Sequence, residues 1–146
     1  MSRSTAAQPT VMVVDDEPSV LRIVRRILEP VGYRVTEAKD GAEACAIVER
    51  TGPLDLLISD FMMPELTGAE VARRFRLKQP DLKVLFVTGF ADGLFNERQA
   101  LWDGEAFLEK PFNQDGLLEA VSLLLFGHTK HEIAADVRQL AAAGGV

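Results

Sequence analysis

The chain contains little cysteine and little histidine. Its 146 residues include one cysteine, Cys45, and two histidines, His128 and His131. A single cysteine cannot form an internal disulfide, and the apolar stripe around Cys45 is typical of a small core residue. The histidines are far from Cys45 in the sequence and have no cluster of acids or thiols beside them. Neither thiol catalysis nor a histidine metal site is therefore indicated.

Long apolar runs and an excess of basic residues are also absent. No apolar run reaches the roughly 20 residues that a membrane span needs, and residues 1–9 lack the hydrophobic stretch of a signal peptide. The chain has 16 lysines and arginines against 22 aspartates and glutamates, which gives a net charge of −6. These features predict a soluble, cytoplasmic protein that binds neither a membrane nor nucleic acid directly.

The chain does contain a regular alternation of apolar and amphipathic segments. We expect strands over 10–15, 33–38, 54–60, 82–87 and 106–109, and helices over 18–28, from Asp40 to the TGP break at 51–53, over 68–78, over 92–102, and from Asn113 to Gly127. This alternation is typical of a single α/β domain with a parallel sheet and helices on both faces. We expect the domain at 10–127, a disordered leader at 1–9 and a tail at 128–146 that can form a helix.

Five polar residues end or directly follow these predicted strands: Asp15, Asp16, Asp60, Thr88 and Lys110. The carboxyl ends of parallel strands meet at one edge of the sheet, where ligands bind. Grouped carboxylates repel one another, and a hard divalent cation, Mg²⁺ or else Mn²⁺, relieves that repulsion. The set predicts a site where Asp60 acts as a nucleophile toward phosphorus, with the cation, Lys110 and Thr88 beside the phosphoryl group.

Four segments resemble the receiver domain of two-component response regulators: VMVVDDEPSV (11–20), LLISDFMMPELTGAEVA (56–72), VLFVTGF (84–90) and FLEKPF (107–112). The resemblance covers about residues 11–126, and its acidic, hydroxyl and lysine–proline motifs occur in the family's order. It implies a flavodoxin-like, doubly wound α/β fold with a five-stranded parallel sheet of order 2-1-3-4-5. That order makes the first and third strands neighbours and puts the strand over 33–38, which alternates polar and apolar residues, at an edge.

The resemblance also implies roles for the site residues. Asp60 would accept a phosphoryl group from a histidine of a sensor histidine kinase or a histidine phosphotransfer protein. Asp16, Asp60 and the backbone carbonyl of Met62 would hold Mg²⁺ with the help of Asp15, and Lys110 would contact the phosphoryl group. Such a protein is no enzyme in the usual sense, because it catalyses only its own phosphorylation and dephosphorylation.

In the same family, phosphorylation is read out as a conformational switch. Thr88 would move toward the phosphoryl group and Phe107 would turn inward. The face formed by 92–102, 106–109 and the helix after Asn113 would then bind a downstream protein target. The resemblance also allows a homodimer, through this face or through the C-terminal tail.

Some positions depart from the family pattern. Phe107 stands where many relatives have Tyr, so any switch there rests on packing. Asp103-Gly104 replaces the usual Gly-Ala, so we expect the positive φ one position later. Met62 and Phe90 occupy positions that tune hydrolysis in the family, and because neither side chain can orient a water molecule, we expect slow self-dephosphorylation.

We expect the kinase to dock at the exposed start of the helix over 18–28, with Leu21, Arg22 and Arg25 as candidate contacts. Two other functions stay open on sequence grounds. One is a receiver that takes no phosphate and acts only as a protein-interaction module. The other is an aspartyl-phosphate hydrolase, which is disfavoured because the first strand of such enzymes ends in DxD, whereas Asp15 and Asp16 are adjacent.

Overall fold

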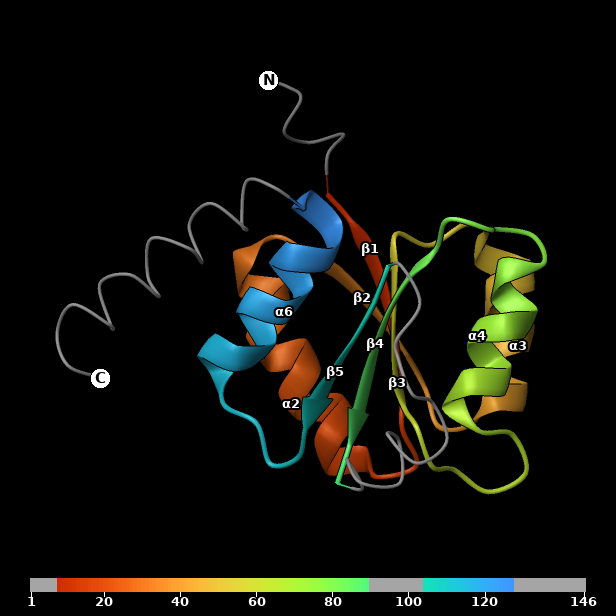
Figure 1. Ribbon diagram of the computed structural model, residues 1–146, viewed down its shortest axis with the longest axis horizontal. Coiled ribbons are helices and arrows are strands. Elements are labelled where there is room, and N and C mark those ends of the chain that lie inside the picture. Colours follow the sequence, from red (N-terminus) through yellow and green to blue (C-terminus); the bar gives the residue numbers. More distant parts are fainter. Residues whose placement is uncertain (1–7, 90–103, 128–146) are drawn as a thin grey trace, which may run out of the picture.

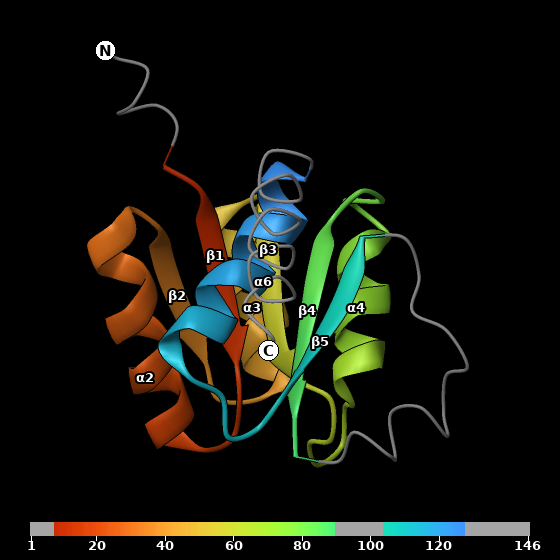
Figure 2. The same cartoon turned by 60° about the vertical axis from the view of Figure 1, so that its left-hand side comes forward.

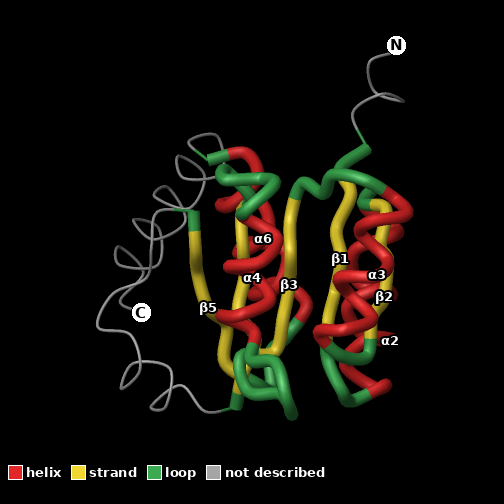
Figure 3. Tube along the Cα trace, turned by 90° about the vertical axis from the view of Figure 1, so that its right-hand side faces the viewer, coloured by secondary structure: helices red, strands yellow, loops and turns green. Residues whose placement is uncertain are grey.

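The structure is a computed structural model that describes residues 8–89 and 104–127 (Figure 1). Its five strands form one parallel sheet in the order β2-β1-β3-β4-β5, with β2 and β5 at the edges (Figure 3). The strands are β1 (Thr10–Val14), β2 (Arg34–Ala38), β3 (Leu56–Asp60), β4 (Lys83–Thr88) and β5 (Glu105–Glu109). The predicted flavodoxin-like order and the edge position of β2 are confirmed.

Four α-helices of the described residues cover the two faces of the sheet (Figures 1 and 2): α2 (Pro18–Leu28), α3 (Gly41–Thr51), α4 (Gly68–Arg76) and α6 (Gln114–Phe126). A short 3-10 helix, η1 (Glu29–Val31), follows α2. One face carries α2 and α6, and the other carries α3 and α4. None of these helices combines the length and the apolar character that crossing a membrane requires.

One helix is shorter than predicted, and three predicted segments fall partly or wholly outside the described residues. The helix predicted over 68–78 ends at Arg76, two residues early, because the N–H groups of Leu77 and Lys78 bond to carbonyls only three residues back, in a tighter turn. The leader at 1–9 lies mostly, and the helix at 92–102 and the tail at 128–146 lie wholly, outside the described residues.

The buried side chains form two apolar layers, one on each face of the sheet. Successive strand residues point to opposite faces, so Val11 and Val13 pack with α2 and α6, whereas Met12 and Val14 pack with α3 and α4. A strand covered on both faces has no solvent-facing side, which explains why the four residues of β1 after Thr10 are all apolar. Cys45 packs against the layer below α3 and α4, in agreement with its predicted core role.

Side-chain caps begin three of the helices where the sequence places a short polar residue. The side chain of Asp40 accepts a hydrogen bond from Glu43 N at 2.8 Å, and that of Asn113 accepts one from Gly116 N at 2.7 Å. Both helices were predicted to begin at these residues, and Thr67 caps α4 in the same way. Each cap satisfies an otherwise unpaired N–H group of the first turn and fixes where the helix leaves the sheet edge.

The start of β5, the strand that leads to Lys110, is tied to α4 and β4. Arg76 Nη1 lies 2.6 Å from Glu105 Oε2, and these side chains are only 14% and 1% exposed. Arg76 also donates hydrogen bonds of 3.1 and 2.9 Å to the carbonyl oxygen of Leu82. Gly104, with φ of +84°, precedes β5, which confirms the expected one-position shift of the positive φ.

Candidate functional site: an acidic cluster with one lysine

Three carboxylates meet at the carboxyl ends of β1 and β3. Because β1 and β3 are neighbours paired through Val14 and Ser59, the residues that follow these two lie side by side. One carboxylate oxygen from each of Asp15, Asp16 and Asp60 lies within 4.8 Å of the others. Asp15 and Asp60 are buried, whereas Asp16 is exposed. The structure thus brings together the three acids that the sequence predicted would share a site.

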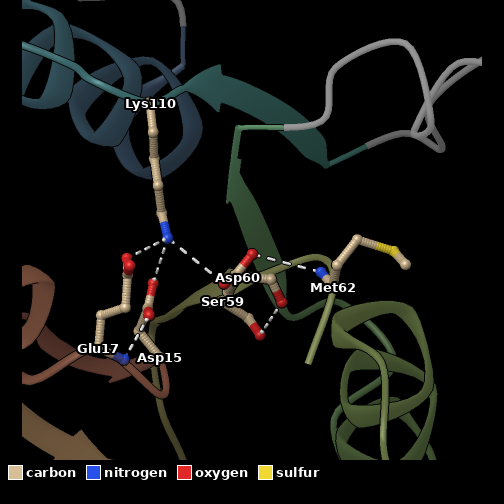
Figure 4. A network of polar contacts seen from close by, with 6 residues as sticks. All are labelled: Asp15, Glu17, Ser59, Asp60, Met62 and Lys110. Carbon is tan, nitrogen blue, oxygen red and sulfur yellow. Dashed lines mark hydrogen bonds and ion pairs between the residues drawn. The ribbon is translucent and has the colours of Figure 1, made fainter. Parts of the chain in front are cut away.

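Lys110 reaches this cluster from the end of β5 (Figure 4). Its N–H group donates to the carbonyl oxygen of Thr88 at 2.9 Å, which extends the β4–β5 ladder and puts the two residues side by side. Its Nζ lies 3.0 Å from Asp15 Oδ2, 3.1 Å from Glu17 Oε1 and 3.3 Å from Asp60 Oδ2. The Lys110–Pro111 peptide bond is cis.

Backbone groups orient the two buried carboxylates. Glu17 N donates to Asp15 Oδ1 at 2.9 Å, and Met62 N donates to Asp60 Oδ1 at 3.3 Å (Figure 4). The hydroxyl of Ser59 donates to the carbonyl oxygen of Asp60 at 2.9 Å. Each buried carboxylate is therefore held by a local N–H group on one oxygen and by Lys110 on the other, which fixes its direction toward the cluster.

The loop after Asp60 passes very close to the first turn of α4. Gly68 N donates to the carbonyl oxygen of Phe61 at 2.9 Å. A Cβ atom on Gly68 would lie only 2.3 Å from the carbonyl oxygen of Asp60 and 3.1 Å from Phe61 Cα. Only glycine fits this approach, so the segment after the acceptor position is locked against α4.

Burial disfavours the charge of the two inner acids. It raises the pKa of Asp15 to about 6, despite the lowering effects of the Glu17 N–H group and of Lys110. It also raises the pKa of Asp60, which the charge of Lys110 opposes. Burial acts to lower the pKa of Lys110, but the close carboxylates of Asp15 and Glu17 and the other nearby negative charge raise that pKa overall. An added cation would stabilise the charged carboxylates.

The donor set fits a hard divalent cation. Asp15 Oδ2 is fully buried and accepts no hydrogen bond of good geometry, although Lys110 Nζ lies 3.0 Å away. This buried oxygen, the Asp60 carboxylate and the exposed Asp16 are oxygen ligands of the kind Mg²⁺ takes, and the exposed side leaves room for water.

In the absence of divalent cations, the buried negative charge of Asp15 should make the free energy of unfolding depend on pH. Its folded-state pKa of about 6 exceeds the ordinary 3.8, so its stabilising contribution is complete below the lower value and is lost as the pH rises through the upper one. We expect Asp15→Asn to be more stable than the wild type at pH 7 by on the order of 2 kcal/mol.

Urea unfolding in EDTA at several pH values measures this effect. The difference between variant and wild type should shrink as the pH falls toward the ordinary pKa of an aspartate. A difference that stays constant with pH would contradict the assignment to Asp15.

The remaining predicted site residues differ in where they lie. Thr88 is the buried last residue of β4, and Phe107 packs partly buried against the layer of α3 and α4. The Met62 side chain is 46% exposed beside Asp60. Phe90 lies outside the described residues. Glu17 and Ser59 were not among the predicted site residues. The signal for Glu17 was its position directly after the acid pair, and the signal for Ser59 was a polar residue in a buried strand.

The structure corrects the docking residue Leu21. Its side chain is only 8% exposed and belongs to the core between α2 and the sheet, so it cannot be a surface contact. Arg25 is engaged within the fold, with ion pairs to Glu29 at 2.9 Å and to Glu37 at 2.8 Å. Arg22 is exposed at the start of α2, where it was expected.

The fold and the site together define a receiver domain, and comparison with known proteins agrees. The family model of the response regulator receiver domain matches residues 11–122. The chain therefore belongs to this family. Its members are phospho-acceptors of two-component signalling that interact with histidine kinases and downstream targets, and are not enzymes in the usual sense.

Curated relatives differ in how much of their length the chain matches. The response regulator receiver protein CpdR of Brucella abortus is 34% identical over 79% of this chain and 95% of its own length. The response regulator MprA of Mycobacterium leprae is 41% identical over 86% of this chain but only 54% of its own length. The sensor kinase CckA of Brucella abortus is 38% identical over 80% of this chain but only 12% of its own length. The similarity to MprA and CckA thus concerns one part of each.

Solved structures show the same fold. The chemotaxis response regulator CheY4 of Vibrio cholerae is 31% identical, with a TM-score of 0.71 over 82% of this chain and 100% of that one. The response regulator TrrA of Thermotoga maritima, solved in complex with Mg²⁺ and BeF, is 33% identical, with a TM-score of 0.70 over 81% and 100% of the two chains.

Proposed function

We propose that the protein is a phospho-accepting receiver in which Asp60 takes a phosphoryl group from a phosphohistidine of a sensor histidine kinase or a histidine phosphotransfer protein. One observation carries the proposal. The buried carboxylate of Asp60 lies within 4.8 Å of two further acids and has Lys110 Nζ 3.3 Å from its Oδ2. This geometry suits a carboxylate that attacks phosphorus beside groups that neutralise the added charge.

In the proposed transfer, an oxygen of Asp60 forms a bond to phosphorus while the phosphorus–nitrogen bond of the donor histidine breaks, and the electron pair stays on the imidazole. Met62 N–H fixes the other carboxylate oxygen, and Lys110 attracts the phosphoryl oxygens. Mg²⁺, or Mn²⁺ in its place, held by Asp15, Asp16, Asp60 and the backbone carbonyl of Met62, would supply further charge neutralisation when bound.

We also propose that phosphorylation changes a binding surface of the protein, as it does in receiver domains. Thr88, buried at the end of β4, lies at the edge where the phosphoryl group would sit, and Phe107 on β5 pairs with Phe86, two residues before Thr88. Their rearrangement would change the surface formed by β5 and α6. This surface would bind a downstream protein target or a second copy of the chain in the cytoplasm. We propose kinase docking at the start of α2, where Arg22 is exposed.

Acetyl phosphate labelling with and without Mg²⁺, read by mass spectrometry, tests the proposal directly. We expect one phosphoryl group per chain, dependent on the divalent cation, and binding of beryllofluoride under the same conditions. Absence of both would identify a receiver that acts only as an interaction module. Turnover of small phosphate esters would instead favour a hydrolase.

Self-dephosphorylation should be slow, because the half-exposed thioether of Met62 can shield the phosphoryl group but cannot orient a water molecule. Decay of labelled protein after removal of the donor, followed by mass spectrometry, measures the lifetime. Met62→Asn, which can hydrogen-bond water, should shorten it, whereas Met63→Leu, a conservative change of a buried neighbour, should not. Loss of the wild-type label within seconds would refute the shielding argument.

A further inference from the structure

The ammonium group of Lys110 has three N–H donors, and three carboxylates surround it. The oxygens of Asp15, Glu17 and Asp60 lie at 3.0, 3.1 and 3.3 Å (Figure 4). Asp60, the proposed acceptor, is the most distant of the three. Lys110 thus donates hydrogen bonds to Glu17 and Asp60 and forms an ion pair with Asp15 before any phosphoryl group arrives, so a phosphoryl oxygen has to compete with these partners for the ammonium group.

The three carboxylates differ in how easily they can release the lysine. The side chains of Asp15 and Asp60 are 1% and 10% exposed, so water cannot readily replace their contact with Lys110. The side chain of Glu17 is 60% exposed at the entry to α2. Glu17 can therefore exchange Lys110 for water at low cost, because an exposed ion pair is weak.

We propose that Glu17 is a positioning residue that holds the ammonium group of Lys110 in the unphosphorylated protein and must release it before Lys110 can contact an incoming phosphoryl group. The proposal rests on the proposed function and adds a residue to it. Glu17 thereby lowers the rate at which Asp60 is phosphorylated.

The step concerned is labelling by a small donor such as acetyl phosphate. An oxygen of Asp60 forms a bond to phosphorus, the bond from phosphorus to the acetyl oxygen breaks, and acetate leaves with the electron pair. No proton moves. A phosphoryl oxygen replaces Glu17 Oε1 as a partner of the Lys110 ammonium group, and water solvates the released Glu17 carboxylate.

Glu17→Gln removes the charged contact and keeps the length of the side chain. We expect it to raise the rate constant for labelling by acetyl phosphate about two- to fivefold, the range that an exposed ion pair allows.

Glu109→Gln is the matched control. Glu109 is exposed at the same sheet edge, next to Lys110 in sequence, but its carboxylate makes no ion pair with a described residue. An equal effect of both variants would mean a general charge effect and would overturn the proposal, as would an unchanged or lower rate in Glu17→Gln.

The chemical reactivity of Lys110 gives a second readout that requires no phosphorylation. Trace acetylation with acetic anhydride, quantified by mass spectrometry, compares Lys110 with the exposed Lys39 and Lys78 in the same chain. Glu17→Gln should raise the relative reactivity of Lys110 about two- to fivefold, and Glu109→Gln should leave it unchanged. Equal reactivity in the wild type and Glu17→Gln would overturn the proposal. If the wild type takes no label at Asp60, the proposed function fails, while this measurement still decides whether Glu17 restrains Lys110.

Discussion

Asp60→Asn is expected to reduce phosphoryl labelling of the protein to background. The amide of asparagine is a poor nucleophile and forms no stable ester with phosphorus, so the change removes the proposed acceptor while its size stays the same. The amide oxygen can still accept the hydrogen bond from Met62 N, which keeps the loop after β3 in place. Labelling with acetyl phosphate and Mg²⁺, followed by mass spectrometry, gives the result directly.

Asp81→Asn is the matched control for this experiment, because it makes the same chemical change at an exposed position before β4, away from the cluster. It should label like the wild type. Circular dichroism and urea unfolding should show that both variants are folded. Labelling of Asp60→Asn at the wild-type rate would show that another residue accepts the phosphoryl group, and the proposed mechanism would then be wrong.

Gly68→Ala should destabilise the protein by about 2–3 kcal/mol, the upper range for overpacking a rigid site. The new Cβ would lie 2.3 Å from the carbonyl oxygen of Asp60 and 3.1 Å from the carbonyl carbon of Asp60 and from Phe61 Cα. All three atoms belong to the backbone, so no flexible side chain can move aside. Either the first turn of α4 or the backbone of Asp60 has to shift. Urea unfolding monitored by circular dichroism measures the loss.

Gly89→Ala provides the control for Gly68→Ala. Among the residues that the structure describes, no atom beyond its chain neighbours lies within 4 Å of the Cβ that this substitution would add at the end of β4, so stability should change little. Because the shift at Gly68 displaces the backbone of the proposed acceptor, Gly68→Ala should also slow acetyl phosphate labelling under conditions where it is folded. Equal stability of the two alanine variants would contradict the close approach between α4 and Asp60.

Much of the fold could be predicted because the local signals and the tertiary structure agree. Pro18, Asp40 and Asn113 favour helix starts through their own backbone and side-chain chemistry, and α2, α3 and α6 begin beside them. The apolar run of β1 after Thr10 is buried on both faces, and the alternating β2 is at the edge. Phe90 and the segment over 92–102 fall outside the described residues, so the sequence predictions about them stay predictions.

The prediction that Leu21 is a surface contact was wrong because the start of α2 is exposed but Leu21 lies on the buried face of that helix. Leu21, Val24 and Leu28 recur at the spacing of one helix face and are all buried against the sheet. Proximity to Asp16 in sequence suggested a surface position, but a helix turns about 100° at each residue, so neighbours in sequence face different directions. The exposed fraction of Leu21, 8%, follows from the orientation of α2 on the sheet.

The sequence by itself determined which residues end the strands, and therefore that Asp15, Asp60, Thr88 and Lys110 would approach one edge, because a parallel sheet directs all strand ends the same way. Only the tertiary structure decided how Lys110 is shared among three carboxylates, that Asp15 is buried enough for its pKa to rise to about 6, and that Gly68 must lack a side chain. These features depend on distances and burial between segments far apart in the chain, and no local pattern encodes them.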